Sequence, residues 1–262
     1  NRAIVEAMRA GGRKTELPDG AIQLVPWTDR EAVNHLLKMD DVIDLVIPRG
    51  GEGLIRTVVE TSTIPVIKHY KGVCHIYVHK DADQEMALKV IANAKCQRPG
   101  VCNAVETVLL DKEIATEFGP KMAQLLTEKG VELRGDSALC EMVSEASPAT
   151  EEDWYREYLD LILNVRIVPD ANEAVEHISK YGSSHSDCIM TKNKAAATAF
   201  THAVDSAVVY VNASTRFTDG GEFGMGAEIG VSTDRIHARG PMGIDELTIY
   251  KYIVDGKGQL RE

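Results

Sequence analysis

Several common features are missing from this 262-residue sequence, and each absence argues against a class of protein. No apolar run approaches the roughly 18 residues that a membrane-spanning helix needs, and the first residues lack the apolar stretch of a signal peptide. No run of Lys or Arg exceeds two residues and the net charge is -11, whereas nucleic-acid binding depends on clustered cations. We therefore expect a soluble, cytoplasmic protein that binds neither nucleic acid nor a membrane.

The cysteines and histidines do not form a disulfide framework or a metal site. The five cysteines, at positions 74, 96, 102, 140 and 188, include no Cys-x-x-Cys pair, and their number is odd. The eight histidines are scattered, and none has the spacing of a zinc site. We expect free thiols and no bound metal.

Helical and strand-like segments alternate along the first part of the chain, which is typical of α/β proteins with a parallel sheet. The length and the 44% hydrophobic composition favour two domains, and we place a boundary near residue 80. Up to residue 95, the pattern predicts helices over 2–10, 29–38, 53–61 and 84–95, and strands over 22–25, 42–48, 65–67 and 74–78.

The alternation continues in the second part of the chain. The pattern predicts helices over 103–107, 112–129, 136–145, 171–181 and 193–204, and strands over 108–110, 131–133, 164–168, 187–191 and 207–211. The tail over 247–254 is β-rich, and a terminal strand of this kind often pairs with another segment or subunit. The chain opens inside an amphipathic helix without an initiator Met, so we expect a further segment upstream.

A glycine-rich loop, Arg49-Gly50-Gly51-Glu52-Gly53, follows a strand pattern and opens a helix. Backbone N–H groups and the helix dipole can hold a phosphate in this setting. The spacing of the full dinucleotide-binding motif is incomplete, so a tight strand-to-helix turn is the alternative.

Cys102 lies between Pro99-Gly100, which predicts a turn, and 103–107, which predicts a helix start. Unpaired N–H groups at a helix N-terminus stabilise a thiolate, which would make Cys102 a nucleophile. A buried structural cysteine is the alternative, and the local sequence leaves both open.

The segment 211–221 is dense in polar residues directly after a predicted strand. A loop at the carboxyl end of a strand is a common place for ligand contacts in α/β proteins. Arg216 within it could hold a carboxylate or phosphate by a bidentate contact, or form a surface salt bridge.

Seven stretches, in order along the chain, carry a family resemblance, and the most specific is Tyr-Val-Asn-Ala-Ser-Thr-Arg-Phe-Thr-Asp-Gly-Gly at 210–221. The stretches are 47–51, 72–78, 93–95, 97–99, 102–107, 210–221 and 237–243. On these residues the chain resembles the γ-glutamyl phosphate reductases, also called glutamate-5-semialdehyde dehydrogenases, of the aldehyde dehydrogenase superfamily.

The resemblance implies an α/β, aldehyde dehydrogenase-like fold and an enzyme that uses NADPH and forms homo-oligomers. Residues 1–80 would be the C-terminal portion of a Rossmann-type NADPH-binding domain, 81–238 the catalytic domain, and 239–262 a C-terminal β oligomerisation segment. Members also carry residues upstream of this point, including an Asn that helps stabilise the oxyanion.

The resemblance also implies the reaction. Cys102 would attack γ-glutamyl phosphate and expel phosphate to give a thioester, which NADPH reduces to glutamate 5-semialdehyde, the precursor of pyrroline-5-carboxylate on the route to proline. Its own backbone N–H would contribute to the oxyanion site. Glutamate 5-kinase is a possible partner upstream.

Further site residues follow by carry-over or from their chemistry. Glu157 matches the superfamily Glu that holds the nicotinamide ribose, and three glycines would lie near cofactor phosphate: Gly50, Gly51 and Gly53. The candidates for binding substrate are Arg98, Asn103, Ser214, Arg216 and Arg239.

The stretch 68–72 lacks the Glu base with which oxidative aldehyde dehydrogenases activate water, and this absence favours a reductase. Two alternatives stay open: a CoA-acylating aldehyde dehydrogenase, and a domain without activity that assembles through 247–254. The sequence does not decide between NADPH and NADH.

Overall fold

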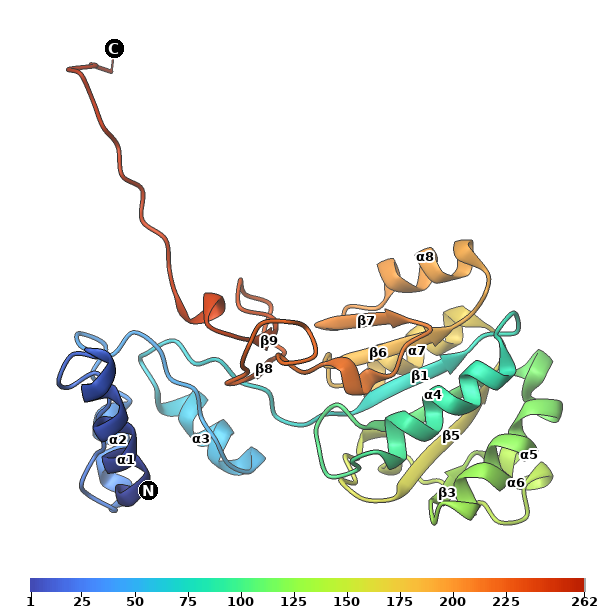
Figure 1. Ribbon diagram of the computed structural model, residues 1–262. Helices are drawn as coiled ribbons and strands as arrows, with labels where there is room; N and C mark the ends of the chain where they lie inside the picture. The colour runs from blue at the N-terminus through green and yellow to red at the C-terminus, as the bar shows by residue number, and fades with distance from the viewer. Residues whose placement is uncertain (262) are drawn as a thin grey trace. The chain divides into compact units, whose positions relative to one another are not determined.

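The computed structural model describes residues 1–261, which divide into two compact units. The smaller unit comprises 1–48 and 56–66 and contains α1 (Arg2–Gly12), the 3-10 helix η1 (Arg13–Thr15), α2 (Arg30–Leu36) and most of α3 (Glu52–Thr61). Figure 1 shows these elements in blue and cyan. The helices expected over 2–10, 29–38 and 53–61 are confirmed.

The strands expected in the smaller unit are wrong within the described residues. Residues 22–25 are irregular, and the runs 42–48 and 65–67 contribute only one parallel bridge, between Val46 and Val66. A strand forms when a neighbouring strand satisfies its backbone N–H and C=O groups, and apolar composition alone does not supply that neighbour.

The larger unit comprises 49–55 and the chain from 67 onward, and it contains a seven-stranded sheet in the order β4-β3-β5-β2-β1-β6-β7. All neighbours in this sheet pair in parallel. The strands are β1 (Cys74–Val78), β2 (Val105–Asp111), β3 (Glu132–Gly135), β4 (Ser147–Pro148), β5 (Ile162–Val168), β6 (Ser186–Met190) and β7 (Val208–Val211). The α/β fold with a parallel sheet is confirmed.

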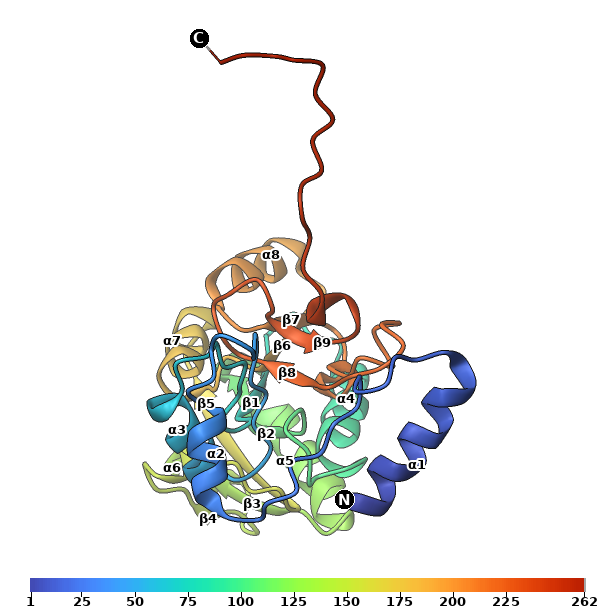
Figure 2. The same cartoon turned by 90° about the vertical axis from the view of Figure 1, so that its left-hand side faces the viewer.

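Helices cover both faces of this sheet (Figure 1, Figure 2). They are α4 (Gln84–Cys96), α5 (Lys112–Glu128), α6 (Ser137–Met142), α7 (Ala171–Tyr181) and α8 (Lys194–Ala203). Each begins after an Asp or Asn whose side chain accepts a hydrogen bond from a backbone N–H of the first turn. Such an N-cap contributes about 1 kcal/mol, and it explains why the starts of these helices could be located within a few residues from the sequence.

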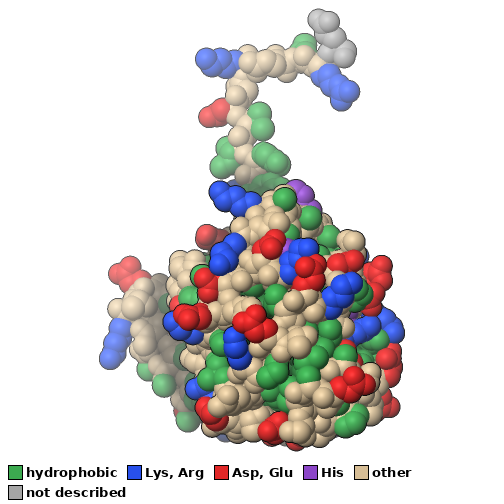
Figure 3. All heavy atoms as spheres, turned by 90° about the vertical axis from the view of Figure 1, so that its right-hand side faces the viewer, with side chains coloured by type: hydrophobic (Ala, Val, Ile, Leu, Met, Phe, Trp, Pro, Cys, Tyr) green, Lys and Arg blue, Asp and Glu red, His purple; other side chains and the backbone are tan. Residues whose placement is uncertain are grey.

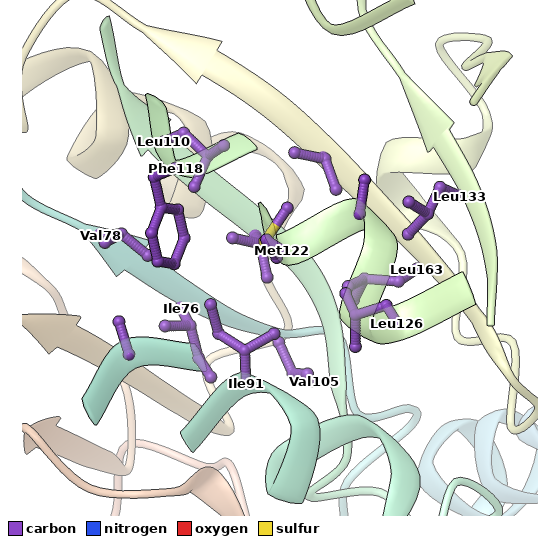
Figure 4. Packing of buried hydrophobic residues seen from close by; sticks show 14 of the residues in the cluster. Ile76, Val78, Ile91, Val105, Leu110, Phe118, Met122, Leu126, Leu133 and Leu163 are labelled. Atoms are coloured by element: carbon purple, nitrogen blue, oxygen red, sulfur yellow. The ribbon is translucent and has the colours of Figure 1, made fainter. Parts of the chain in front are cut away.

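The alternation of side chains along each strand builds two cores. Ile76 and Val78 of β1 point to the face that packs against α4, α5 and α6, whereas Tyr77 points to α7 and α8. Figure 4 shows the first core, in which Phe118 and Met122 of α5 lie against the strands. Because β1 and β2 are buried on both faces, the site must lie at an edge of the sheet, where strands meet loops.

The chain beyond β7 forms short elements. These are the 3-10 helix η3 (Thr215–Phe217), the antiparallel pair β8 (Gly230–Ser232) and β9 (Gly240–Met242), and the 3-10 helix η4 (Asp245–Leu247); a further 3-10 helix, η2 (Asp153–Tyr155), precedes β5. The strand expected over 247–254 is not formed in the described residues. The domain ranges 1–80, 81–238 and 239–262 stay a prediction; in the described chain β1 belongs to the large sheet.

None of the helices in residues 1–261 is both long and apolar enough to cross a membrane. Figure 3 shows one face of the molecule, on which acidic and basic side chains are interspersed.

Candidate active site

Cys102 lies in a turn between α4 and β2, next to the amino-terminal edge of the sheet. The helix expected over 103–107 is wrong, because β2 begins at Val105 and pairs there with Cys74 of β1. Val105, Thr107 and Val108 are β-branched, and β-branched residues favour a strand over a helix. Activation of Cys102 by a helix N-terminus is therefore excluded.

The backbone of the Cys102 turn is held by Gly72 and Cys74. A Cβ atom at Gly72 would overlap the carbonyl oxygen of Cys102, so only glycine allows this approach. The Cys74 thiol donates a hydrogen bond to the same carbonyl oxygen, with a sulfur–oxygen distance of 3.3 Å. The Gly72 N–H in turn donates to Glu157 Oε1 at 2.8 Å, which links the turn to the predicted cofactor residue.

The electrostatic surroundings keep Cys102 protonated. Burial, followed by the negative charges of Glu157 and Glu228, raises the pKa of the Cys102 thiol to about 11. The positive charge of Arg216 acts in the opposite direction. Burial also raises the pKa of both carboxyls, although backbone N–H groups of Gly72 and Gly220 oppose that change. A proton must therefore leave Cys102 before it can act as a nucleophile near neutral pH.

Asn103, next to Cys102, connects the nucleophile turn to the segment after β7. Its Nδ2 donates to the carbonyl oxygen of Thr218 at 2.9 Å, and its own carbonyl oxygen accepts from Thr215 Oγ1 at 2.7 Å. Its Oδ1 accepts a short hydrogen bond from the guanidinium of Arg216. These bonds hold the loop predicted to bind ligand beside Cys102.

The loop after β7 does not stay at the carboxyl end of that strand. Thr218 Oγ1 lies 2.6 Å from Ser186 Oγ, at the first residue of β6, and 2.8 Å from the hydroxyl of Tyr210. The loop therefore returns along the edge strand to the amino-terminal end of the sheet. The expectation that 211–221 would act at the carboxyl end of its strand is corrected by this path.

The remaining predicted substrate residues occupy different places. Ser214 caps η3 by accepting from the Arg216 N–H, and Arg98 lies near enough to Arg216 to contribute, after burial, to lowering its pKa. Arg239 instead donates to Asp205, at 2.8 Å to Oδ1 and 2.9 Å to the carbonyl oxygen. The structure gathers Arg98, Asn103, Ser214 and Arg216 into one group and engages Arg239 elsewhere.

The glycine-rich loop leads into the N-terminus of α3, which begins at Glu52. A Cβ atom added at Gly51 or Gly53 would meet nothing within 4 Å, whereas one at Gly50 would press on Leu54. The charge of Glu52 contributes to the raised pKa of Glu157, so the start of this helix lies within electrostatic reach of the Cys102 surroundings.

Three residues near Cys102 were not singled out as site residues from the sequence. Glu228 acts on Cys102 through its charge, and Lys95 and Glu106 form a fully buried ion pair at the two ends of the loop that contains Cys102. For Glu106, the sequence does contain a signal: it is the one charged residue in the mostly apolar segment 105–110, and a carboxylate in a buried strand needs a partner. Among residues 1–261, no group of three His, Cys, Asp or Glu side chains is placed to hold a metal ion.

The sequence profile described as "Aldehyde dehydrogenase family" matches residues 3–158. The chain belongs to this family. It is 55% identical to the gamma-glutamyl phosphate reductase of Nautilia profundicola over 262 residues, which cover all of this chain and 64% of that protein. The chain therefore spans less than two thirds of the length of this relative.

Solved structures agree with the family assignment. The gamma-glutamyl phosphate reductase of Thermotoga maritima is 49% identical and has a TM-score of 0.96, over all of this chain and 63% of that one. An acetylating aldehyde dehydrogenase of Geobacillus thermoglucosidasius has a TM-score of 0.76 at 19% identity, over 98% of this chain and 66% of that one, which shows a shared fold. The expected aldehyde dehydrogenase-like fold is confirmed.

Proposed function

We propose that this chain carries the nucleophile of an NADPH-dependent reductase that converts γ-glutamyl phosphate to glutamate 5-semialdehyde and phosphate, the second step from glutamate to proline. The observation that carries the proposal is the setting of Cys102. It lies in a turn held by Gly72 and Cys74 and tied through Asn103 to Arg216, in a chain 55% identical to a gamma-glutamyl phosphate reductase.

The residues present fit a nicotinamide cofactor. Glu157 uses Oε1 to accept from Gly72, and its second oxygen can accept from a ribose hydroxyl. The open space at Gly51 and Gly53 lets a phosphate approach the backbone N–H groups at the start of α3. NADP is also named in the structure of a related glyceraldehyde-3-phosphate dehydrogenase from Bacillus halodurans.

The chemistry begins with the loss of the Cys102 proton. Glu157 and Glu228 are carboxylates with raised pKa values whose charges act on the thiol, so either is a stronger proton acceptor than an exposed carboxylate. Cys102 Sγ then bonds to the acyl carbon of the substrate. The carbon–oxygen bond to phosphate breaks, its electron pair leaves with phosphate, and a thioester on Cys102 results.

NADPH, when bound, supplies the hydride that reduces this thioester. Hydride addition leaves a tetrahedral oxyanion that is still attached to Cys102. The oxyanion re-forms the C=O bond as the carbon–sulfur bond breaks, the electron pair of that bond returns to Sγ, and the aldehyde leaves. Burial of Cys102 and the absence of a Glu in 68–72 both protect the thioester from water.

Phosphate-dependent reduction of NADP⁺ by glutamate 5-semialdehyde, measured in the complete protein, tests the proposal. We expect activity with phosphate and none with CoA in its place. Cys102→Ala should lower the rate on the order of 10³-fold or more, because only binding contributions to catalysis then remain. Cys140→Ala, which removes a partly exposed thiol on α6, is the matched control and should stay active.

Two outcomes would contradict the proposal. Turnover that survives Cys102→Ala would exclude the nucleophile, and turnover that requires CoA would assign the chain to an acylating enzyme. Replacing NADP⁺ by NAD⁺ in the same assay decides the cofactor.

We further propose that the complete protein acts in the cytoplasm as a homo-oligomer and receives its substrate from a glutamate 5-kinase. γ-Glutamyl phosphate is an acyl phosphate and hydrolyses readily in water. A kinase that makes it next to the reductase would shorten its time in solution and reduce hydrolysis.

A further inference from the structure

A pocket of about 260 Å³ opens beside the nucleophile turn. Its lining combines one cation, two carboxylates, two amides and one aromatic ring, from Asn93, Gln97, Arg216, Phe217, Asp219 and Glu222. Charges of both signs therefore meet in one small space.

Arg216 ties this pocket to the nucleophile. Its guanidinium donates to Asn103 Oδ1, on the residue after Cys102, and its Nε donates to Gln97 Oε1 at 2.8 Å. Its charge also acts on the Cys102 thiol. Arg216 therefore contributes to the pocket and also acts on the turn that contains the reacting sulfur.

Arg216 retains hydrogen-bonding capacity. A guanidinium has five N–H donors, and within residues 1–261 two of them are engaged by side chains, at Gln97 and Asn103. The remaining donors match a carboxylate, for which the planar guanidinium is the preferred partner.

The two carboxylates that line the pocket belong to one turn. Asp219 Oδ1 accepts from the N–H groups of Gly221 and Glu222, at 2.9 and 3.2 Å. In the described chain, Asp219 Oδ2 and the Glu222 carboxylate have no hydrogen-bonding partner. They are acceptors suited to a cationic group.

We propose that this pocket binds the amino-acid end of the substrate, with Arg216 on the α-carboxylate and Asp219 and Glu222 on the α-ammonium group. The inference rests on the proposed function and extends it, because it names the residues that select an α-amino acid. A pocket for a simple anion would gain nothing from two carboxylates, which repel it. A zwitterion matches both signs, and its acyl carbon, three bonds from the α-carbon, would extend from Arg216 toward the turn of Asn103 and Cys102.

Protection of Cys102 from iodoacetamide tests the inference without requiring turnover. The labelling rate of Cys102 in the complete protein is followed by peptide mass spectrometry with L-glutamate, glutarate or 4-aminobutanoate present. Glutarate lacks the α-ammonium group of L-glutamate, and 4-aminobutanoate lacks its α-carboxylate. We expect L-glutamate to protect at a concentration about ten-fold lower than either analogue, as one charge-assisted hydrogen bond is worth roughly that factor or more.

Variants of the carboxylates provide the second measurement. Asp219→Asn and Glu222→Gln together should reduce the preference for L-glutamate over glutarate to about two-fold or less and leave the preference over 4-aminobutanoate. Asparagine keeps an oxygen for the two N–H groups of the turn, so the fold is retained. Glu176→Gln removes an exposed carboxylate from α7 and is the control, with no change expected.

Turnover separates this inference from the proposed function. The preference for glutamate 5-semialdehyde over 5-oxopentanoate should fall in the same double variant. Equal protection by the three compounds in the unmodified protein, or an unchanged preference in the variant, would overturn the pocket assignment. Selective protection by L-glutamate without any aldehyde turnover would support the pocket and refute the reductase.

Discussion

Lys95 Nζ donates a hydrogen bond to Glu106 Oε2 at 2.7 Å, and both side chains are fully buried. Lys95 lies in the last turn of α4 and Glu106 is the second residue of β2, so the pair closes the loop that contains Cys102. Glu106 Oε1 also accepts from the N–H of Leu159, at 3.4 Å, two residues after Glu157. One ion pair thus fixes both the nucleophile turn and the segment that carries Glu157.

Removing Lys95 alone should destabilise the protein strongly. Lys95→Met leaves a buried carboxylate without its partner, which costs about 3–5 kcal/mol of unfolding free energy. Lys95→Met with Glu106→Gln should recover most of this loss, because the remaining amide is neutral and can still accept from Leu159. Urea denaturation of the complete protein measures both values.

The exposed pair Lys121–Glu117 on α5 supplies the control, and Lys121→Met should leave the free energy of unfolding nearly unchanged, because exposed ion pairs contribute little to stability. Equal costs for Lys95→Met and Lys121→Met would show that burial of the first pair has no energetic consequence.

The sequence predicted the large unit well because its elements are specified locally. The helices that begin after Asp83, Asp111, Asp136, Asp170 and Asn193 carry their own caps, and the strands between them are apolar runs of strand length. The strands expected over 22–25, 42–48, 65–67 and 247–254 failed because a strand depends on a partner that local sequence does not supply. The helix expected over 103–107 failed because β2 begins at Val105.

The pH dependence of Cys102 alkylation should reflect the two carboxylates beside it. Burial and the charges of Glu157 and Glu228 raise the pKa of the thiol to about 11, so labelling by iodoacetamide should keep accelerating above pH 9. Glu157→Gln or Glu228→Gln removes a negative charge that disfavours the thiolate. Each variant should move the midpoint of the labelling rate to lower pH and speed labelling at pH 8.

Labelling of Cys96, whose raised pKa has burial as its main cause, gives an internal reference in the same samples. A midpoint for Cys102 that stays fixed in both variants would show that the carboxylates do not act on the thiol.

The site was predictable only in part. Cys102, Asn103, Arg216 and Glu157 were selected from motifs, and the structure brings them to the same edge of the sheet. The raised pKa of the Cys102 thiol was not predictable, because part of it comes from the charge of Glu228, more than 100 residues away in sequence. Spacing along the chain cannot reveal which distant carboxylate will fold against a thiol.

Asp153 should make stability sensitive to acid. Burial alone would raise the pKa of its carboxyl, but four hydrogen bonds of 2.7 Å outweigh it and hold the pKa well below its usual range. The donors are Arg134, Tyr158, and the N–H and hydroxyl of Thr150. Since the pKa is depressed in the folded state, this contribution is complete above the unfolded value of about 3.9 and is lost as the pH falls below it.

Asp153→Asn should lower the free energy of unfolding at pH 7 by about 2–4 kcal/mol, because it removes a buried charge from Arg134 and turns a donor toward Thr150. Chemical denaturation between pH 3 and pH 7 measures the free energy of unfolding of both proteins. The difference in this free energy between Asp153→Asn and the unmodified protein should become smaller toward pH 3. Glu141→Gln, at an exposed position of α6, should show no such trend. A constant difference across this range would contradict the assignment.

The tail beyond η4 carries apolar side chains that the described chain leaves uncovered. Ile249, Tyr250, Tyr252, Ile253 and Val254 are between 82% and 99% exposed, and Figure 3 shows hydrophobic side chains along this segment. The backbone from 249 to 254 has no regular structure, so its N–H and C=O groups are free to pair with another strand. We therefore predict that this segment adds to a sheet of a second copy.

Sedimentation of the complete protein should show a dimer or larger species, and Ile249→Lys with Ile253→Lys should shift it to smaller species at the same concentration. The lysines place charge where a partner strand would bury apolar surface, and each desolvated charge costs more than the apolar contact gains. Lys251→Gln is the control, because it removes a charge from the same segment and places no charge at an apolar position. It should leave the sedimentation coefficient unchanged. If the double variant sedimented like the unmodified protein, the assembly would have to use another surface.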